Sequence, residues 1–165
     1  MERRSTGQSV QFDRLDGRLV ALLAEQPRIG VLECARRLGV ARGTVQARLD
    51  RLQRDGVIRG FGPDVDPAAL GYEVTAFVTL EIRQGSGHQA VAKHLTRIPE
   101  VLELHTVTGQ GDLLCRIVAR SNADLQRVID EVVADEDIRR ASTLIALSAP
   151  IPYRVLPLVE RRAID

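Results

Sequence analysis

The hydrophobic pattern of this chain changes period near residue 72. Up to that point apolar residues recur at intervals of three and four, which is typical of amphipathic helices. From Val74 to Ile82 they occupy every second position, as in a strand with one buried face. A helix-period segment followed by a strand-period segment predicts an α+β chain of two small domains, and 165 residues are enough for both.

Three helices are expected before residue 57. The first follows Asp13, a suitable N-cap, and the second and third cover 31–39 and 42–56, each ending at a glycine. The segment 57–66, VIRGFGPDVD, places turn residues between short apolar runs and predicts a two-stranded ribbon. Together these elements predict a winged helix-turn-helix domain over residues 1–62.

A different topology is expected after residue 62. The linker 63–71 contains DPAALG, whose Pro and terminal Gly predict a one-turn helix. The strand at 72–82 is followed by a helix that ends before Pro99, two strands joined by the turn in TVTGQGDLL (106–114), a helix capped by Ser121 or Asn122, and a last strand at 142–148. The order βαββαβ predicts a ferredoxin-like domain over residues 72–165.

Charge is distributed unevenly along the chain. Residues 1–60 contain 12 Arg and 7 acidic residues, whereas the remainder contains 11 basic and 15 acidic residues. A basic segment on a near-neutral protein favours contact with a polyanion, DNA first, or forms a solvated arginine-rich surface. Aromatic residues make up only 3% of the chain, which argues against recognition of single strands by base stacking.

The sequence gives little support to other kinds of site. Cys34 and Cys115 lack a C-x-x-C partner and are expected to be free, buried thiols. The three histidines do not share a face, so no metal and no cofactor are predicted, and no Ser/His/Asp or paired-carboxylate spacing indicates an enzyme. No run approaches the ~18 apolar residues of a membrane helix, so a cytoplasmic protein is expected.

Five motifs follow one another along the chain: FDRLDGRLVALL, RIGVLECARRLGV, VQARLDRLQRDGVIRG, VDPAALG and TVTGQGDLL. In their order and spacing the sequence resembles the Lrp/AsnC (feast/famine) family of transcription regulators. The resemblance implies a DNA-binding domain followed by a βαββαβ domain that senses a small effector, an amino acid for this family. Members often carry Ser where Gly30 and Ala41 stand and Leu at Cys34, so the third helix is expected to begin without a side-chain cap at Ala41.

The third helix is therefore predicted to enter the major groove of double-stranded DNA. Its exposed side offers Arg42 and Gln46, which are expected to read bases, together with Thr44. Arg48 and Arg51 lie further along the helix and are expected to anchor phosphates. The alternative interpretation is a solvated charged face.

The turn in TVTGQGDLL has two interpretations. A phosphate loop would precede a helix, but the next segment is strand-like, so the turn is expected to be a hairpin. Since the domain resembles a sensor, its backbone N–H groups are candidates to bind the effector carboxylate, with the effector site formed by Thr108, Gly109, Gln110, Gly111 and Asp112. Alternatively, the glycines only permit a tight turn that Asp112 closes.

The assembly and the activity have alternatives too. Phe77 lies on the strand face opposite the apolar row, and this face is available to the sheet of a second copy, which predicts a homodimer. The resemblance further implies octamers. A siroheme-decarboxylase-like tetrapyrrole enzyme on the same scaffold is the rival activity, but the acidic second domain disfavours it. The basic third helix likewise disfavours a metabolite-binding protein that has lost DNA binding.

Overall fold

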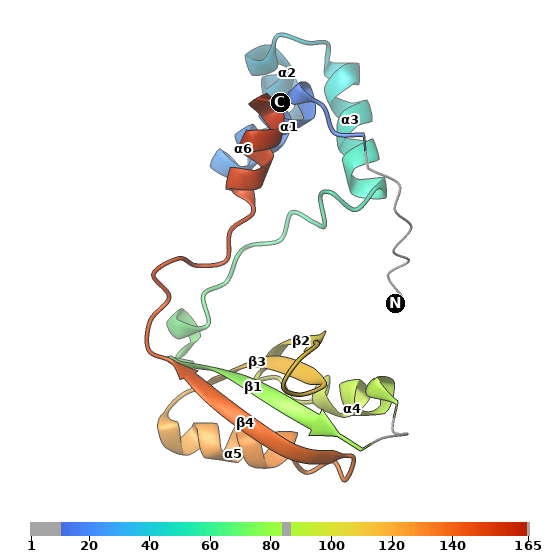
Figure 1. Cartoon of the computed structure of the whole chain (residues 1–165). Coiled ribbons are helices and arrows are strands. Elements are labelled where there is room, and N and C mark those ends of the chain that lie inside the picture. The colour runs from blue at the N-terminus through green and yellow to red at the C-terminus, as the bar shows by residue number, and fades with distance from the viewer. Residues whose placement is uncertain (1–10, 84–86, 165) are drawn as a thin grey trace. The chain divides into compact units, whose positions relative to one another are not determined.

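The computed structural model describes residues 11–83 and 87–164, which form two compact units (Figure 1). The helical unit comprises the chain up to Pro63 together with the segment from Ile151 onward. The sheet unit runs from Asp64 to Pro150. The chain therefore leaves the helical unit once and returns to it. The sequence-based boundary of 72–165 differs from this division at its C-terminal end.

The helical unit contains the three predicted helices α1 (Arg14–Glu25), α2 (Val31–Leu38) and α3 (Arg42–Arg54). The prediction of Asp13 as the N-cap of α1 is confirmed, since its carboxylate accepts the Asp16 N–H at 2.9 Å and the Asp16 carboxylate accepts the Asp13 N–H at 3.0 Å. Ala41 precedes α3 without a side-chain cap, as expected. Buried apolar residues from all three helices form the core: Leu19, Cys34, Ala35, Val45, Leu49 and Leu52.

The predicted ribbon of a winged domain is wrong. Residues 57–66 form no strand, and the next regular element is the 3-10 helix Ala68–Leu70, which ends at Gly71 with φ of 88°. Turn residues separate apolar ones in this segment, but Val57, Phe61 and Val65 remain exposed. Ile58 packs against the helical core, but a single half-buried side chain does not provide the apolar face that would stabilise a two-stranded ribbon.

A helix that the sequence did not predict, α6 (Leu156–Ile164), packs on α1 within the helical unit. Gly17 makes this approach possible, because a Cβ atom at that position would lie 2.4 Å from Cβ of Ala163. A glycine inside a helix normally costs stability relative to alanine. Here its missing side chain is the condition for contact between the two helices.

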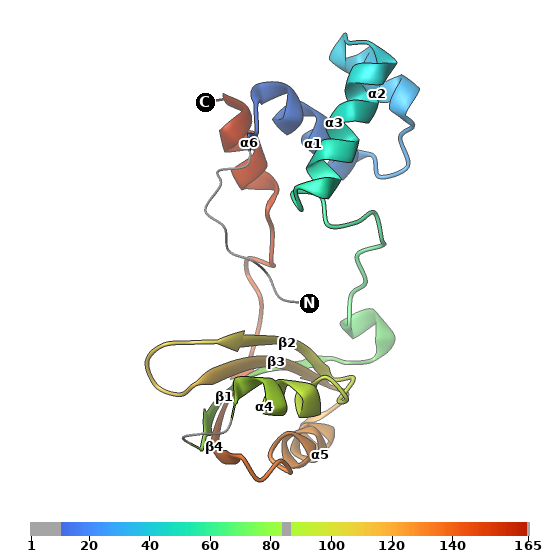
Figure 2. The ribbon, with the colours of Figure 1, turned by 90° about the vertical axis from the view of Figure 1, so that its right-hand side faces the viewer.

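The sheet unit has the predicted order βαββαβ. Its elements are β1 (Val74–Ile82), α4 (His88–Leu95), β2 (Val101–Thr106), β3 (Leu113–Ala119), α5 (Asn122–Val132) and β4 (Ile138–Ala146). The strands pair antiparallel in the order β2-β3-β1-β4, and both helices cover the same face of the sheet (Figure 2). Ser121 caps α5 by accepting the Asp124 N–H at 3.1 Å.

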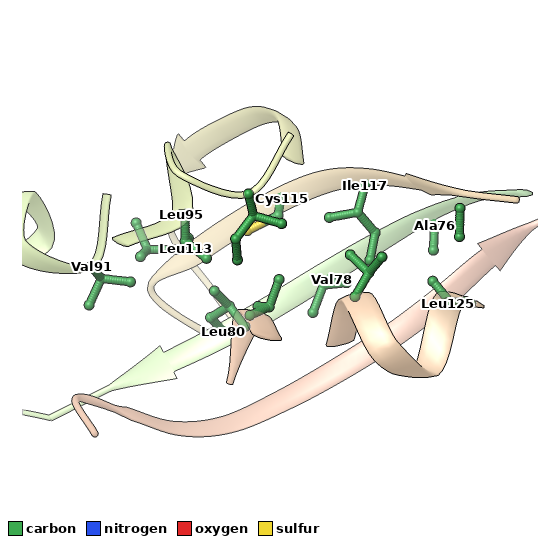
Figure 3. Packing of buried hydrophobic residues seen from close by; sticks show 13 residues of the cluster. Ala76, Val78, Leu80, Val91, Leu95, Leu113, Cys115, Ile117 and Leu125 are labelled. Atoms are coloured by element: carbon green, nitrogen blue, oxygen red, sulfur yellow. The ribbon is translucent and has the colours of Figure 1, made fainter. Parts of the chain in front are cut away.

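The core of the sheet unit lies between the sheet and its two helices (Figure 3). Every second residue of β1, namely Ala76, Val78 and Leu80, points into this core, which explains the period of two in the sequence. The thiol of Cys115 lies within this core, and burial raises its pKa to about 11. The buried set is Ala76, Val78, Leu80, Val91, Leu95, Ile98, Leu113, Cys115, Ile117, Ala119, Leu125, Val128 and Val132.

Candidate functional site

The N-terminal half of α3 presents polar side chains to solvent. Val45, Leu49 and Leu52 are buried against the other helices, so Arg42, Thr44 and Gln46 are left exposed. The Gln46 side-chain amide donates to Asp50 at 2.8 Å across one turn of the exposed surface. Within the described part of the chain no side chain pairs with Arg42, whose guanidinium is free to bind an external acceptor.

Arg48 and Arg51 instead bind acidic side chains at the start of α1. Nη1 of Arg48 lies 2.7 Å from both carboxylate oxygens of Asp13 and 2.7 Å from Oδ1 of Asp16. Nη2 of Arg51 lies 2.6 Å from Oδ2 of Asp16, and its Nη1 donates to the Gln11 carbonyl. We call Asp13, Asp16, Arg48 and Arg51 the carboxylate–arginine cluster.

Three members of the cluster are largely shielded from solvent, whereas the Asp13 side chain is 48% exposed. The Asp16 side chain is fully buried, and the side chains of Arg48 and Arg51 are 24% and 28% exposed. The hydrogen bond from Arg48 holds the pKa of Asp13 below its usual range, and the same contact raises the pKa of Arg48. Two carboxylates and two guanidinium groups leave the cluster without net charge.

The sequence did not predict this cluster, because its carboxylates lie more than thirty positions from its arginines. By itself, the position of Asp16 in the sequence indicates only an acid that suits the first turn of a helix. Arg48 and Arg51 each precede a buried leucine of α3 by one position, which is a signal that they lie at the edge of the core.

An open groove of about 590 Å³ runs beside α3. Small residues of α3 form one part of its lining, and three members of the carboxylate–arginine cluster form another. The lining residues are Gln11, Asp13, Gly43, Thr44, Ala47, Arg48 and Arg51. The groove therefore brings Thr44 next to Arg48 and Arg51 but does not include Arg42 or Gln46.

The second candidate site is the glycine hairpin, residues 107–112, which joins β2 and β3 as predicted. Gly109 and Gly111 have φ of 112° and 103°, in the region that favours glycine. A Cβ atom on Gly111 would also lie 2.3 Å from the Thr79 side chain on β1. Thr108, Gly109 and Gln110 form the exposed part of the hairpin, whereas Gly111 and Asp112 lie against β1.

Asp112 connects the glycine hairpin to the neighbouring strand. Its backbone N–H donates to the Leu80 carbonyl at 2.8 Å, and its carboxylate accepts the Ile82 N–H at 2.8 Å. Its carbonyl accepts the Val107 N–H at 3.0 Å, which closes the hairpin. These bonds give Asp112 a structural role, which the turn interpretation anticipated.

Two family models match the chain in the order of its two units. The AsnC-type helix-turn-helix domain matches residues 12–53, and the Lrp/AsnC ligand binding domain matches residues 75–156. The chain belongs to the Lrp/AsnC family. The first match contains α1, α2 and α3 up to Gln53, and the second contains the four strands except Val74, the first residue of β1.

Similar proteins of the Lrp/AsnC family span nearly the same length. An HTH-type transcriptional regulator of Pyrococcus abyssi is 37% identical over 149 residues, covering 90% of this chain and 94% of the relative. The regulatory protein AsnC of Escherichia coli is 30% identical over 147 residues, covering 88% and 97%.

Solved structures of Lrp/AsnC proteins share the fold. The structure of E. coli AsnC matches with a TM-score of 0.82 at 28% identity and covers 89% of this chain and 99% of that chain. The feast or famine regulatory protein from M. tuberculosis, complexed with L-methionine, matches with a TM-score of 0.76 at 26% identity and covers 86% and 95%.

These matches establish the class of this Lrp/AsnC protein. It is a transcriptional regulator with a helix-turn-helix for DNA and a ligand-binding domain, and it is not an enzyme. The comparisons give no support to the tetrapyrrole alternative. The cysteines and His105 do not form a further site. Cys34 and Cys115 are free, buried thiols, and Nε2 of the exposed His105 lies 3.3 Å from Oε2 of Glu103.

The described ranges, residues 11–83 and 87–164, contain neither a candidate metal site nor a candidate membrane span. No group of three or more His, Cys, Asp or Glu side chains in these ranges could hold a metal ion. In the same ranges no helix combines the length and the apolar character needed to cross a membrane.

Proposed function

We propose that this Lrp/AsnC regulator recognises a specific duplex DNA sequence through α3 and changes its DNA binding in response to a free amino acid. The observation that carries the DNA half is the exposed row Arg42, Thr44 and Gln46 on a helix whose opposite face is buried. Arginine and glutamine can each form paired hydrogen bonds with base edges in the major groove. Cytoplasmic location stays a prediction.

Arg42 and Gln46 are the proposed base-reading residues, and Thr44 is the proposed contact between them. The Gln46–Asp50 hydrogen bond holds the amide on the exposed surface of α3 but must break or be shared when Gln46 binds adenine. Arg48 and Arg51, predicted as phosphate anchors, differ from these three because their guanidinium groups already bind carboxylates.

The amino-acid half rests on the glycine hairpin and on a similar protein that was solved with L-methionine. Thr108, Gly109 and Gln110 lie exposed, so their N–H and hydroxyl groups are accessible to a carboxylate. Gly111 and Asp112 complete the proposed site by holding the hairpin against β1. This arrangement allows the sensing and the turn-closing interpretations to hold together.

The proposed working form is a homodimer. The sheet face without helices carries Phe77, 38% exposed, paired in register with Leu144, 68% exposed. Arg116 is the other cross-strand neighbour of Phe77, and its Nε is buried without a hydrogen-bond partner among the described residues. Such a face favours a second copy, which would also present two α3 helices to a two-fold DNA site.

Selection of bound sequences from random duplexes, followed by affinity measurements on Gln46→Ala and Arg42→Ala, tests the DNA half. We expect each variant to lose about 1–3 kcal/mol of preference for the selected site and to keep its non-specific binding within a small factor. Glu25→Gln, at the exposed end of α1, is the control. Retention of full sequence preference by both α3 variants would contradict the proposal.

A thermal-shift screen against the common amino acids tests the effector half. A ligand that binds only the folded protein raises its melting temperature by mass action. The proposal expects at least one amino acid to do so at millimolar concentration or below, and a weaker shift in Gln110→Ala would place the site at the hairpin. Absence of any shift, together with unchanged DNA binding in the presence of every amino acid, would contradict it.

A further inference from the structure

We infer that Asp16 is a positioning residue for DNA recognition, which sets the rotation of α3 by binding two of its arginines inside the protein. This inference rests on the proposed role of α3 as the recognition helix. Asp16 itself is fully buried and negatively charged, so it cannot be a DNA contact.

The Asp16 carboxylate binds side chains from two successive turns of α3. Its Oδ1 accepts from Arg48 at 2.7 Å and its Oδ2 accepts from Arg51 at 2.6 Å. Oδ2 also accepts the Asp13 N–H at 3.0 Å, so the carboxylate is fixed to the start of α1. One rigidly held group on α1 thus binds α3 at positions i and i+3.

Directional bonds add a constraint on the rotation of α3 that apolar burial alone does not supply. Val45, Leu49 and Leu52 bury non-directional surface, and such cores tolerate small rotations of a helix. Charge-assisted hydrogen bonds are short and require aligned donors and acceptors. A small rotation of α3 would break them and would move Arg42 and Gln46 relative to the bases.

The same cluster removes two arginines from the attraction to phosphates. Arg48 and Arg51 are balanced by Asp13 and Asp16, so few counterions are displaced from DNA on their account. Arg42 and Arg54, both exposed, keep an unbalanced charge on α3. The structure therefore assigns Arg48 and Arg51 to positioning, in place of the phosphate contacts expected from the sequence.

Asp16→Asn is the decisive variant, because the inference predicts opposite effects on non-specific DNA and on the selected site. Loss of a negative charge and release of Arg51 should strengthen non-specific binding and steepen the dependence of log affinity on log salt by about 0.9 per released arginine. Mispositioned α3 should simultaneously weaken binding to the selected site. We expect the ratio of specific to non-specific affinity to fall about tenfold or more, the value of one lost base contact.

Matched controls separate positioning from charge and from folding. Glu25→Gln removes one exposed negative charge from the same helix and should raise both affinities equally, leaving the ratio unchanged. Circular dichroism and the melting temperature show whether each variant is folded at the assay temperature. If Asp16→Asn does not fold, Arg51→Lys replaces it, since lysine keeps the charge but lacks the guanidinium geometry, and the specificity ratio should again fall.

Arg48→Met supplies the complementary result. If Arg48 is a positioning residue, the salt dependence of non-specific binding stays within about 0.3 of the wild-type slope while the specificity ratio falls. A flattening by about 0.9, one phosphate contact, would overturn the inference, as would an unchanged specificity ratio in folded Asp16→Asn. Failure of the proposed function can be told apart from failure of this inference, because Gln46→Ala and Arg42→Ala would then also keep full sequence preference.

Discussion

The helical unit and the sheet unit hold their elements together in different ways. The sheet unit packs four strands and two helices around one continuous set of thirteen buried apolar residues. The helical unit has only six residues in its buried cluster, and it adds the carboxylate–arginine cluster and the docked helix α6. Small cores bury too little apolar surface to be strongly stable alone, so contacts between distant segments contribute a larger share of the stability in the helical unit.

The two units also differ in how far apart in the sequence their contacting residues lie. Among the described glycines, one in each unit lies at a close approach: Gly111 contacts a strand of its own sheet, whereas Gly17 contacts a helix about 145 positions away. Both units contain an acid that binds across elements: Asp112 binds one backbone N–H, and Asp16 binds two guanidinium groups. The helical unit is thus the one in which distant substitutions should matter most.

Gly17→Ala is expected to cause the largest change in stability and so tests the difference between the two units most strongly. In an isolated helix this substitution stabilises by about 1 kcal/mol, because alanine is the better helix former. Here the new methyl group would overlap Ala163, so we expect destabilisation by about 1–3 kcal/mol, measured by urea unfolding. Hydrogen exchange should show that the loss is concentrated in α6 and α1.

The double variant Gly17→Ala with Ala163→Gly is the control for that contact. It moves the methyl group from one helix to the other, so most of the lost stability should return, although the Cβ would still lie 3.0 Å from Cα of residue 163. A stabilised single variant would show that α6 does not dock on α1, and the difference between the two units would then rest on the carboxylate–arginine cluster alone.

A smaller effect is expected from Asp112→Ala in the sheet unit. The substitution leaves the Ile82 N–H without its acceptor, which should lower the free energy of unfolding by about 1–2 kcal/mol in the absence of effector. Gln110→Ala, at the exposed part of the hairpin, should leave this stability unchanged. Calorimetric titration of both folded variants with the amino acid then separates the roles: loss of affinity in Gln110→Ala alone would limit Asp112 to closing the turn.

Periodicity predicted most of the fold from the sequence. Alternation in β1, helical spacing in α3 and α5, and caps at Asp13 and Ser121 all concern neighbouring residues, and each is confirmed. The ribbon at 57–66 was wrong because its turn residues flank apolar side chains that stay exposed. Helix α6 and the partners of Asp16 were missed because the sequence pattern of one segment does not show which distant segment it contacts.

The sequence predicted where the candidate site residues lie, but not which side chains or backbone groups they bind. The exposed placement of Arg42, Thr44 and Gln46 follows from helical spacing, and the hairpin follows from its glycines. The internal bonds of Arg48, Arg51 and Asp112 could not follow from spacing, since each depends on tertiary contacts.

The central claim, that DNA binding by α3 responds to an amino acid bound by the sheet unit, is tested most directly by a two-way titration. The affinity for the selected DNA is measured without and with saturating amino acid, and the affinity for the amino acid is measured without and with saturating DNA. Linkage requires the same factor in both directions, and allosteric proteins typically show factors of about 5–150. We expect equal factors clearly different from one. An amino acid that binds the free protein and the DNA complex with identical affinity would contradict the claim.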